Sequence, residues 1–254
     1  LVGTLHCHLD VPVTCKIRKL HTAAATAELA RLLQGAGASA ITVHGRTREQ
    51  KGRHTGAADW ETVKRVKQAV SVPVISNGGV ADLSAAERCM QFTQCDGVMF
   101  GEAALENPAV FNGGEVGHQQ EDFAREYLQL LDTYSTDRRH SKQHIFTLLY
   151  AGLQVHTDLR QQLHVARTLE EMVAVVDALA VRPRQWNGPF CNKPKEYTSW
   201  YHRHQWEYWK HAHAHGLPGC KREAPVVAEW DEPALKDALE PWVLDIDELG
   251  LHVW

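Results

Sequence analysis

The first part of the chain alternates four times between a short apolar run and a polar segment of helical character. The runs occupy residues 11–17, 40–43, 72–75 and 97–100, are rich in β-branched residues, and begin about 25 to 32 residues apart. This spacing is the usual length of a βα unit. Continuous apolar runs favour a parallel sheet that is buried on both faces. We therefore expect residues 1–112 to form an α/β domain with four parallel strands.

Helix signals fill the intervals between these runs. Thr22 is a candidate N-cap for a helix that ends near Gln34, and Asp59 is a candidate N-cap for a helix over residues 60–70. A third helix is expected to begin at Asp82 or Ser84. Apolar residues recur at helical spacing in the first two segments, which predicts that each packs one face against the sheet.

Two further regions follow. Residues 113–181 predict a small helical bundle, with helices over 121–134 and 142–163 and a third that starts at Thr168, which forms a capping-box pattern with Glu171. Residues 182–254 hold seven of the eight tryptophans and show little periodicity. We expect this last region to be an irregular, Trp/His-rich extension with a short helix near 233–239.

Composition narrows the classes of function. The formal net charge of -4 argues against binding of nucleic acid by overall charge, so any RNA contact needs a local basic patch. The six cysteines form no Cys-x-x-Cys pair, which favours reduced thiols in the cytoplasm or nucleus. No apolar run reaches the roughly 20 residues of a membrane helix, so we expect no membrane partner. We also expect a monomer.

The strand ends carry the residues that suit a ligand site, because ligands bind at the carboxyl ends of parallel strands. These ends are Lys16 with Arg18, His44-Gly45-Arg46-Thr47, Asn77-Gly78-Gly79, and Gly101-Glu102. The two glycine turns precede helices and expose backbone N–H groups, which suits a phosphate. Flavin mononucleotide (FMN) fits this set, since Lys16 is placed to stabilise the negative charge of a reduced flavin ring.

Four segments carry a resemblance to a known family: Val11-Pro-Val-Thr-Cys-Lys-Ile-Arg18, Thr42-Val-His-Gly-Arg-Thr-Arg-Glu-Gln-Lys-Gly52, Pro73-Val-Ile-Ser-Asn-Gly-Gly79, and Asp96-Gly-Val-Met-Phe-Gly101 with Asn107-Pro108. They resemble the tRNA-dihydrouridine synthases, and look most like the eukaryotic branch that acts on positions 16 and 17 of the D-loop. The resemblance covers about residues 1–180. It implies the second half of a (β/α)8 TIM barrel, strands 5 to 8, followed by a helical tRNA-binding domain.

The resemblance also implies residue roles. The ring of the flavin would be contacted by Lys16 and His44. The phosphate end would be held by Asn77, Gly78, Gly79, Gly101 and Glu102. Glu102 would use its backbone, because a carboxylate repels a phosphate. The tRNA would be contacted by Arg46, Arg48, Lys142 and His144.

The implied reaction is reduction of uridine to 5,6-dihydrouridine. In the family NADPH reduces FMN, a hydride passes to C6 of the base, and a cysteine in an Asn-x-Gly-Cys-Pro loop protonates C5. The sequence has no such loop, and strand alternation points Cys15 to the face opposite Lys16. The proton-donating cysteine is therefore expected upstream of Leu1. Because a general acid contributes about 10²- to 10⁴-fold, we expect this chain alone to be a fragment with little activity.

Two rival functions stay open, a dihydroorotate-type flavin oxidoreductase and a non-catalytic RNA-binding remnant. The role of the tail, residues 182–254, stays open as well. Its cysteines and histidines match no common zinc spacing, so we expect no metal site. Its interleaved basic and aromatic residues suit either stacking on RNA bases or packing against the helical bundle.

Overall fold

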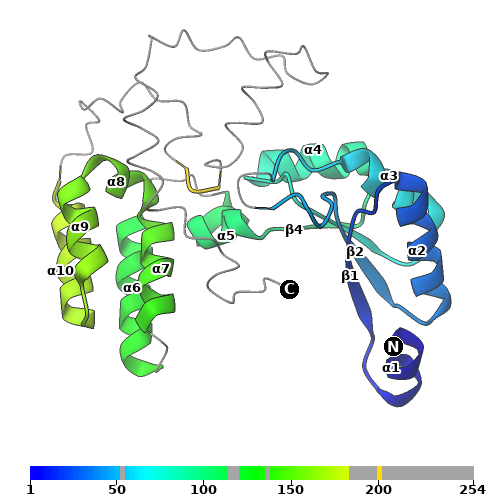
Figure 1. Ribbon diagram of the computed structural model, residues 1–254, viewed down its shortest axis with the longest axis horizontal. Coiled ribbons are helices and arrows are strands. Elements are labelled where there is room, and N and C mark those ends of the chain that lie inside the picture. Colours follow the sequence, from blue (N-terminus) through cyan, green and yellow to red (C-terminus); the bar gives the residue numbers. More distant parts are fainter. Residues whose placement is uncertain (52–54, 114–119, 135–137, 183–198, 202–254) are drawn as a thin grey trace, which may run out of the picture.

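A computed structural model describes residues 1–51, 55–113, 120–134, 138–182 and 199–201. The described chain forms two neighbouring bodies, a sheet covered by helices and a helical bundle (Figure 1). The predicted extension 182–254 lies outside the described residues apart from Arg182 and the short segment 199–201, and the helix predicted at 233–239 lies outside them altogether.

The sheet has four parallel strands in sequential order, as the repeated apolar runs predict. The strands are β1 Thr14–Arg18, β2 Ala40–His44, β3 Val74–Asn77 and β4 Gly97–Met99. The first strand begins three residues later than predicted. Val11 is 64% exposed and therefore gains little from strand burial, and Pro12 has no N–H to donate to a ladder.

Three helices pack on one face of this sheet: α2 Ala23–Gly35, α3 Trp60–Ala69 and α4 Leu83–Thr93. Their N-caps are Thr22, Asp59 and Asp82, each of which accepts a hydrogen bond from a backbone N–H of the first turn. The shared core is made of buried apolar side chains, among them Ala27, Ala30, Ile41, Val43, Val63, Val66 and Val74. The predicted α/β architecture and the predicted caps are thereby confirmed.

The other face of the sheet is exposed along its edge strand β1, which differs from the expectation of burial on both sides. Along β1 the side chains of Thr14, Lys16 and Arg18 are exposed, while Cys15 and Ile17 pack against the helix-covered core. The two charged side chains explain the difference, since burying them without partners is strongly unfavourable. This second face is the one that carries the candidate site.

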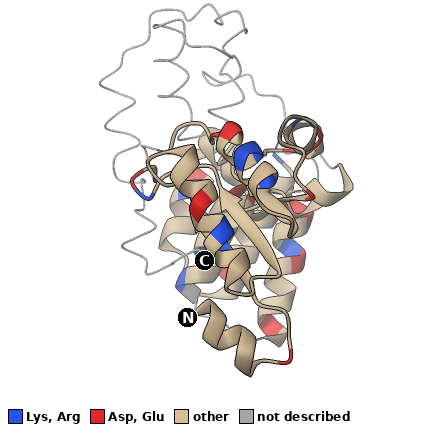
Figure 2. Cartoon of the chain, turned by 90° about the vertical axis from the view of Figure 1, so that its right-hand side faces the viewer, with Lys and Arg blue, Asp and Glu red and all other residues tan. Residues whose placement is uncertain are grey.

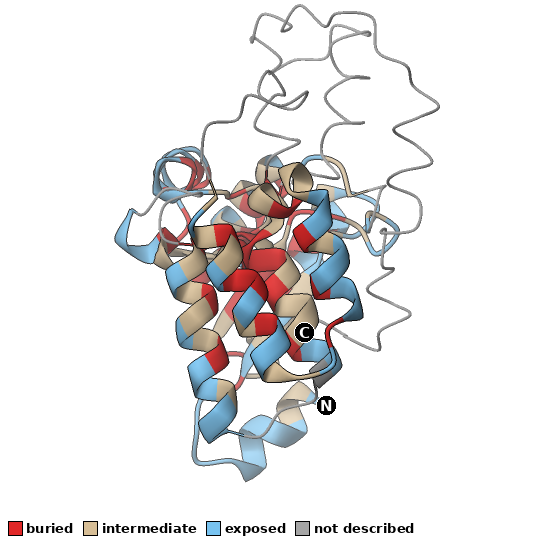
Figure 3. Cartoon of the chain, turned by 90° about the vertical axis from the view of Figure 1, so that its left-hand side faces the viewer, coloured by how far each residue is buried: buried red, intermediate tan, exposed pale blue. Residues whose placement is uncertain are grey.

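The bundle contains five helices in the described chain: α6 Gln120–Thr133, α7 Arg138–Leu148, α8 Tyr150–Val155, α9 Thr157–Val165 and α10 Leu169–Ala180. The single helix predicted over 142–163 is wrong, because the backbone breaks at Leu149 and at His156. The breaks let Leu148, Leu153 and Leu163 all enter one core. In Figure 3 the buried positions of the bundle gather where its helices face one another, and exposed positions lie on its outer sides. The capping box at Thr168 is confirmed.

Short elements connect and extend the two bodies. Helix α1 Val2–His8 precedes the sheet and has no counterpart among the predicted elements. Helix α5 Glu102–Glu106 and a 3-10 helix, Pro108–Asn112, lead from β4 toward the bundle, and α5 contacts α7. None of the described helices is long and apolar enough to cross a membrane. On the face drawn in Figure 2, acidic and basic residues are interspersed rather than segregated.

Candidate active site at the carboxyl ends of the strands

The strand register places predicted site residues in one row. Arg18 pairs with His44, His44 with Asn77, and Asn77 with Met99. Directly paired residues of neighbouring parallel strands project to the same face, so these side chains stand side by side on the face away from the core. Lys16 lies two residues earlier on β1 and projects to that same face. The structure therefore brings Lys16, His44 and Asn77 together, as predicted.

His44 is bonded to the second arginine of the site. Nη1 of Arg46 lies 3.3 Å from Nε2 of His44, and Nε of Arg46 donates to the carbonyl of Gly56 at 3.1 Å. A guanidinium can only donate, so Nε2 of His44 accepts and the imidazole proton resides on Nδ1. His44 is thus a neutral imidazole that offers an N–H on its other side.

Burial and nearby charges keep His44 neutral. Burial contributes most, and the positive charges of Arg18, Arg46 and Lys16 add to it, so that the pKa of His44 is lowered to about 3. The pKa of Lys16 is itself lowered by burial and by Arg18. Three cations around one neutral imidazole create a local positive potential, although the chain as a whole is acidic. Such a potential suits a phosphate or an anionic ring.

Arg18 shapes the loop that follows β2. Its Nη1 donates to the carbonyl of Thr47 at 2.7 Å and lies 3.4 Å from that of Gln50. The side-chain oxygen of Gln50 accepts from the Thr47 N–H at 2.9 Å, which closes the loop on itself. Arg18 is therefore a loop anchor as well as a source of positive charge.

A close backbone approach at Gly45 places the start of α3. The N–H of Asp59 donates to the carbonyl of Gly45 at 2.7 Å, and a Cβ on Gly45 would lie only 2.8 Å from the Asp59 carbonyl oxygen. Asp59 also caps α3 through Thr62 and pairs with Lys19 at 2.5 Å. Only glycine allows this contact, so Gly45 links the His44 loop to α3.

The Gly78–Gly79 turn packs under His44. Both glycines have positive φ, +94° and +76°, and a Cβ on Gly78 would lie 2.9 Å from Cδ2 of His44. The Trp60 indole donates to the Gly78 carbonyl at 3.2 Å. These contacts leave backbone, rather than side chains, facing the imidazole. A turn of this kind is the cradle that a phosphate or ring edge needs.

The second predicted glycine turn is less closely tied to the row. Gly101 is exposed and precedes the short helix α5. The Glu102 carboxylate attracts Arg46. That a phosphate would meet only the Glu102 backbone stays a prediction.

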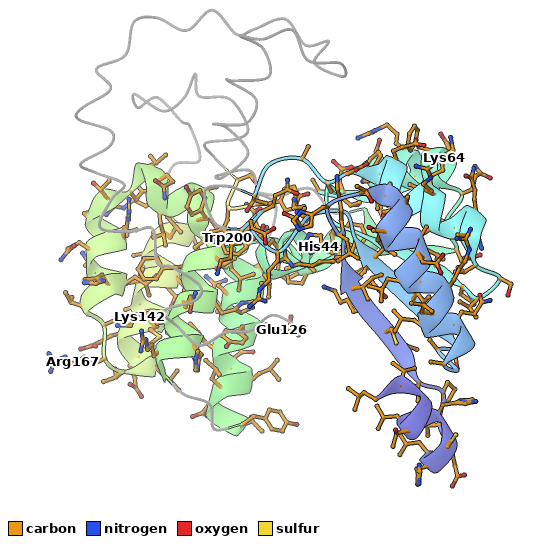
Figure 4. The ribbon with its side chains drawn as sticks, turned by 45° about the vertical axis from the view of Figure 1, so that its right-hand side comes forward. His44, Lys64, Glu126, Lys142, Arg167 and Trp200 are labelled. Carbon is orange, nitrogen blue, oxygen red and sulfur yellow. The ribbon has the colours of Figure 1, made fainter. Side chains whose placement is uncertain are left out.

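The four predicted tRNA contacts lie in different environments. Arg46 is only 6% exposed, whereas Arg48 is exposed on the loop after β2. Lys142 on α7 donates to the His164 carbonyl at 2.9 Å. His144 packs edge-on against Tyr127, with ring centroids 4.6 Å apart. Figure 4 shows Lys142 on the bundle, apart from His44 on the sheet.

The described cysteines lie away from this row. Cys15 packs on the core face of β1, and burial raises its pKa. Cys89 is fully buried and donates to Oγ of Ser76 at 3.2 Å, and Cys95 is buried beside Gly97. Cys7 is exposed on α1. Cys191 and Cys220 lie outside the described residues.

Sequence reasoning missed one buried acid near the site. Glu106, at the end of α5, accepts hydrogen bonds from Oγ of Ser199 at 2.8 Å and from the N–H groups of Trp200 and Tyr201 at 2.8 and 2.9 Å. The partners are separated by 93 to 95 residues. No local pattern joins residues so distant, and only the aromatic-rich composition of the tail hinted at this contact.

Comparisons of the sequence with known proteins point to one family. A sequence model described as dihydrouridine synthase (Dus) matches residues 1–182. A Mus musculus protein named tRNA-dihydrouridine(16/17) synthase [NAD(P)(+)]-like is 42% identical over 177 residues, which are 70% of this chain and 37% of that protein. The Saccharomyces cerevisiae tRNA-dihydrouridine(16/17) synthase [NAD(P)(+)] is 37% identical over 229 residues, covering 76% of this chain and 54% of the yeast protein. The chain thus spans between about a third and about half of these relatives.

Proposed function

Because the chain belongs to the dihydrouridine synthase family, we propose that it holds the flavin of an enzyme that reduces uridine to 5,6-dihydrouridine in tRNA. The observation that carries this proposal is the neutral His44, bonded to Arg46 and set beside Lys16 above the Gly78 turn. This arrangement offers an N–H donor, positive charge and a glycine backbone turn in one place. Those are the features that a flavin nucleotide requires.

The residues of the row fit FMN by charge and by shape. Lys16 and the Nδ1–H of His44 would face the flavin ring, and Asn77, Gly78 and Gly79 would lie along the phosphate end. Gly101 and the backbone of Glu102 would complete that end. The chemistry supplied by bound FMN is hydride transfer, from NADPH to C6 of the uracil. The positive charges of Lys16 and Arg18 would stabilise the anion that forms on reduction.

We assign the sheet to strands 5 to 8 of a (β/α)8 barrel. The family has a TIM-barrel fold, and the parallel order β1-β2-β3-β4 with helices on one face is the wall of such a barrel. The exposed face with Lys16 and Arg18 would then face the barrel interior. Ligands of these barrels bind at the carboxyl ends of the strands, where the row lies.

The substrate of the proposed reaction is tRNA, and the D-loop uridines at positions 16 and 17 are the proposed targets. The names of the mouse and yeast relatives carry these positions. Arg48 supplies an exposed cation next to the site, and Lys142 with His144 supplies the corresponding contact on the bundle. We propose that the protein works as a monomer in the cytoplasm or nucleus. No described residue is assigned as the proton donor.

Titration of the 254-residue chain with FMN tests the proposal. Binding is followed by the quenching of flavin fluorescence. Lys16→Gln is expected to weaken binding about tenfold, because a charge-assisted contact is lost. Lys64→Gln is the matched control, since Lys64 lies on α3 away from His44 (Figure 4). Absence of FMN binding by the unaltered chain, or equal affinity of both variants, would contradict the proposal.

The choice between RNA and a free pyrimidine as ligand distinguishes the proposed function from a dihydroorotate-type oxidoreductase. A fluorescent RNA hairpin with the sequence of a tRNA D-arm is expected to bind the chain, whereas free orotate or dihydroorotate is not. Binding of the free pyrimidine together with FMN, and not of the hairpin, would favour a dihydroorotate-type oxidoreductase.

A further inference from the structure

A short segment from beyond the family-matched residues is anchored where the sheet meets the bundle. The match to the family model ends at residue 182. Residues 199–201 lie beside α5, between the bundle and the sheet (Figure 1). Oγ of Ser199 and the backbone N–H groups of Trp200 and Tyr201 all donate to the carboxylate of Glu106. The segment therefore has a defined place on the family-matched part of the chain.

The anchor is specific because its acid is buried. Glu106 is only 2% exposed. A buried carboxylate is strongly unfavourable unless several donors satisfy it, and here two backbone N–H groups and a hydroxyl do so. The Glu106 main-chain carbonyl also accepts from the Gln120 side chain at 2.7 Å, which ties the start of α6 to the same point. Glu106 thus joins α5, α6 and the anchored segment.

The anchor leaves the tryptophan as the least buried residue of the three. Ser199 and Tyr201 are each 8% exposed, whereas Trp200 is only partly buried. In a segment that served packing alone, the large indole would be the first group to bury, because it removes the most apolar surface from water. Instead the backbone N–H of Trp200 is fixed 2.8 Å from Oε1 of Glu106, and part of the residue stays open to solvent.

Trp200 stands between residues that the proposed function assigns to one ligand complex. Figure 4 shows it between His44 on the sheet and Lys142 on the bundle. His44 belongs to the row that would hold the flavin, and Lys142 is a proposed tRNA contact. An RNA that extends from the bundle to the flavin therefore passes Trp200.

We propose that Trp200 is a base-stacking residue of the RNA site, presented at this junction by the Glu106 anchor. The inference rests on the proposed function and deepens it, because it names a contact for the RNA substrate. Every base has a π-face, and an indole stacks on it without using charge. Such a contact needs an unstacked base, so it favours nucleotides of a loop, such as the D-loop, over a base-paired stem.

Fluorescence anisotropy of a D-arm hairpin titrated with the 254-residue chain tests the inference. Trp200→Ala is expected to weaken binding about tenfold, the effect of losing one stacked base. Trp200→Phe keeps an aromatic face and is expected to recover most of the affinity. Neither variant should change the slope of log Kd against log salt, because an uncharged ring neutralises no phosphate. A duplex of the D-stem without its loop should bind all three chains equally.

Tyr134→Ala is the matched control for removal of an accessible aromatic ring. Tyr134 is 67% exposed and follows the last residue of α6, at the opposite end of that helix from Gln120. Its loss should leave hairpin affinity unchanged. FMN affinity, measured by the quenching of flavin fluorescence, should be the same for Trp200→Ala and the unaltered chain.

Glu106→Gln tests the presentation of Trp200. The amide replaces one acceptor oxygen by a donor that faces the donors of the segment, so hairpin affinity should fall about as far as in Trp200→Ala. The two changes combined should weaken binding no more than either change alone, because both remove the same contact. Thermal unfolding followed by circular dichroism shows whether the variants are folded. Ser199→Ala, which removes only the hydroxyl bond, replaces Glu106→Gln in this comparison if the latter does not fold.

The possible results separate the inference from the proposed function. Equal hairpin affinity of Trp200→Ala and the unaltered chain would overturn the inference and leave the proposed function standing. Additive losses in the combined variant would also overturn it, since Trp200 would then act without the anchor. Weaker FMN binding by Trp200→Ala would overturn it by assigning the indole to the flavin. Failure of the unaltered chain to bind the hairpin would refute the proposed function, and the inference with it.

Discussion

Nη1 of Arg46 donates to Nε2 of His44 at 3.3 Å, and this contact fixes which imidazole nitrogen carries the proton. Because arginine keeps its protons, the accepting nitrogen of His44 must be unprotonated. The nearby charges of Arg18 and Lys16 act in the same direction. A histidine in this setting serves as an oriented hydrogen-bond donor rather than as a positive charge.

The depressed pKa of His44 predicts a stability that is lost in acid. The unfolded chain binds the proton with a pKa near 6.5, whereas folding lowers the pKa to about 3. The stabilisation is therefore complete above about pH 6.5 and is lost as the pH falls toward 3. Between pH 7 and pH 5 this group should contribute a loss of about 2 kcal/mol in the free energy of unfolding.

Urea unfolding at the two pH values measures this effect. His44→Gln removes the titrating group, so its free energy of unfolding should fall less than that of the unaltered chain between the two pH values. His21→Gln is the control, because His21 is exposed and lies outside the row. Equal pH dependence of the unaltered chain and His44→Gln would show that His44 is not held neutral by the fold.

Gly78 should tolerate no side chain. Gly78→Ala places a Cβ 2.9 Å from Cδ2 of His44 at a residue with a φ of +94°. We expect a loss of about 1 to 3 kcal/mol in the free energy of unfolding, because the backbone is strained and His44 is displaced. Thermal unfolding followed by circular dichroism measures the change.

A second glycine substitution serves as the control for Gly78. Gly35 ends α2, and a Cβ there would meet nothing within 4 Å. Gly35→Ala should leave the stability unchanged or raise it by up to about 1 kcal/mol, since alanine is the better helix former. Similar losses for both variants would mean that the contact with His44 is not the cause.

Two substitutions of Asp59 should separate the stability contributed by a helix cap from that contributed by an ion pair. Asp59→Ala removes the cap of α3 and the pair with Lys19, and is expected to cost about 1 to 2 kcal/mol of stability. Asp59→Asn keeps an N-cap oxygen and loses only the partly exposed ion pair, so a loss below about 1 kcal/mol is expected. Urea unfolding of the two variants distinguishes these contributions, and equal losses would assign the effect to the ion pair.

Arg48 should contribute to RNA binding through its charge alone. Arg48→Gln is expected to weaken binding of a fluorescent D-arm hairpin and to reduce the slope of log Kd against log salt by about one. Arg31→Gln is the control, since Arg31 lies on α2 and pairs with Glu28. Fluorescence anisotropy at several salt concentrations gives both slopes. An unchanged slope for Arg48→Gln would remove this arginine from the interface.

Local patterns account for most of the regular structure. The N-caps Thr22, Asp59, Asp82 and Thr168 are visible because a cap bonds to N–H groups only a few residues away. The predicted helix over 142–163 fails for the opposite reason. Its apolar residues satisfy a helical pattern, but one straight helix would leave part of them outside the core, and the backbone breaks at Leu149 and His156 instead.

The different burial of the two arginines that follow β2 also could not be predicted from local sequence. Arg46 and Arg48 are indistinguishable as strand-end cations in the sequence, yet one is 6% exposed and the other lies on the surface. Burial depends on what covers a side chain. The bonds of Ser199, Trp200 and Tyr201 to Glu106 likewise come from a segment that no local rule places there.

The amino-acid sequence by itself determined the four strands, the caps of the first helices, and the placement of Lys16, His44 and the Gly78 turn at strand ends, because these follow from contacts and periodicities within a few residues. Only the tertiary structure decided the neutral state of His44, the burial of Arg46, and the docking of Ser199–Trp200–Tyr201 on Glu106. These depend on desolvation and on hydrogen bonds between distant residues. Such terms exist only once the chain has folded and excluded water from the site.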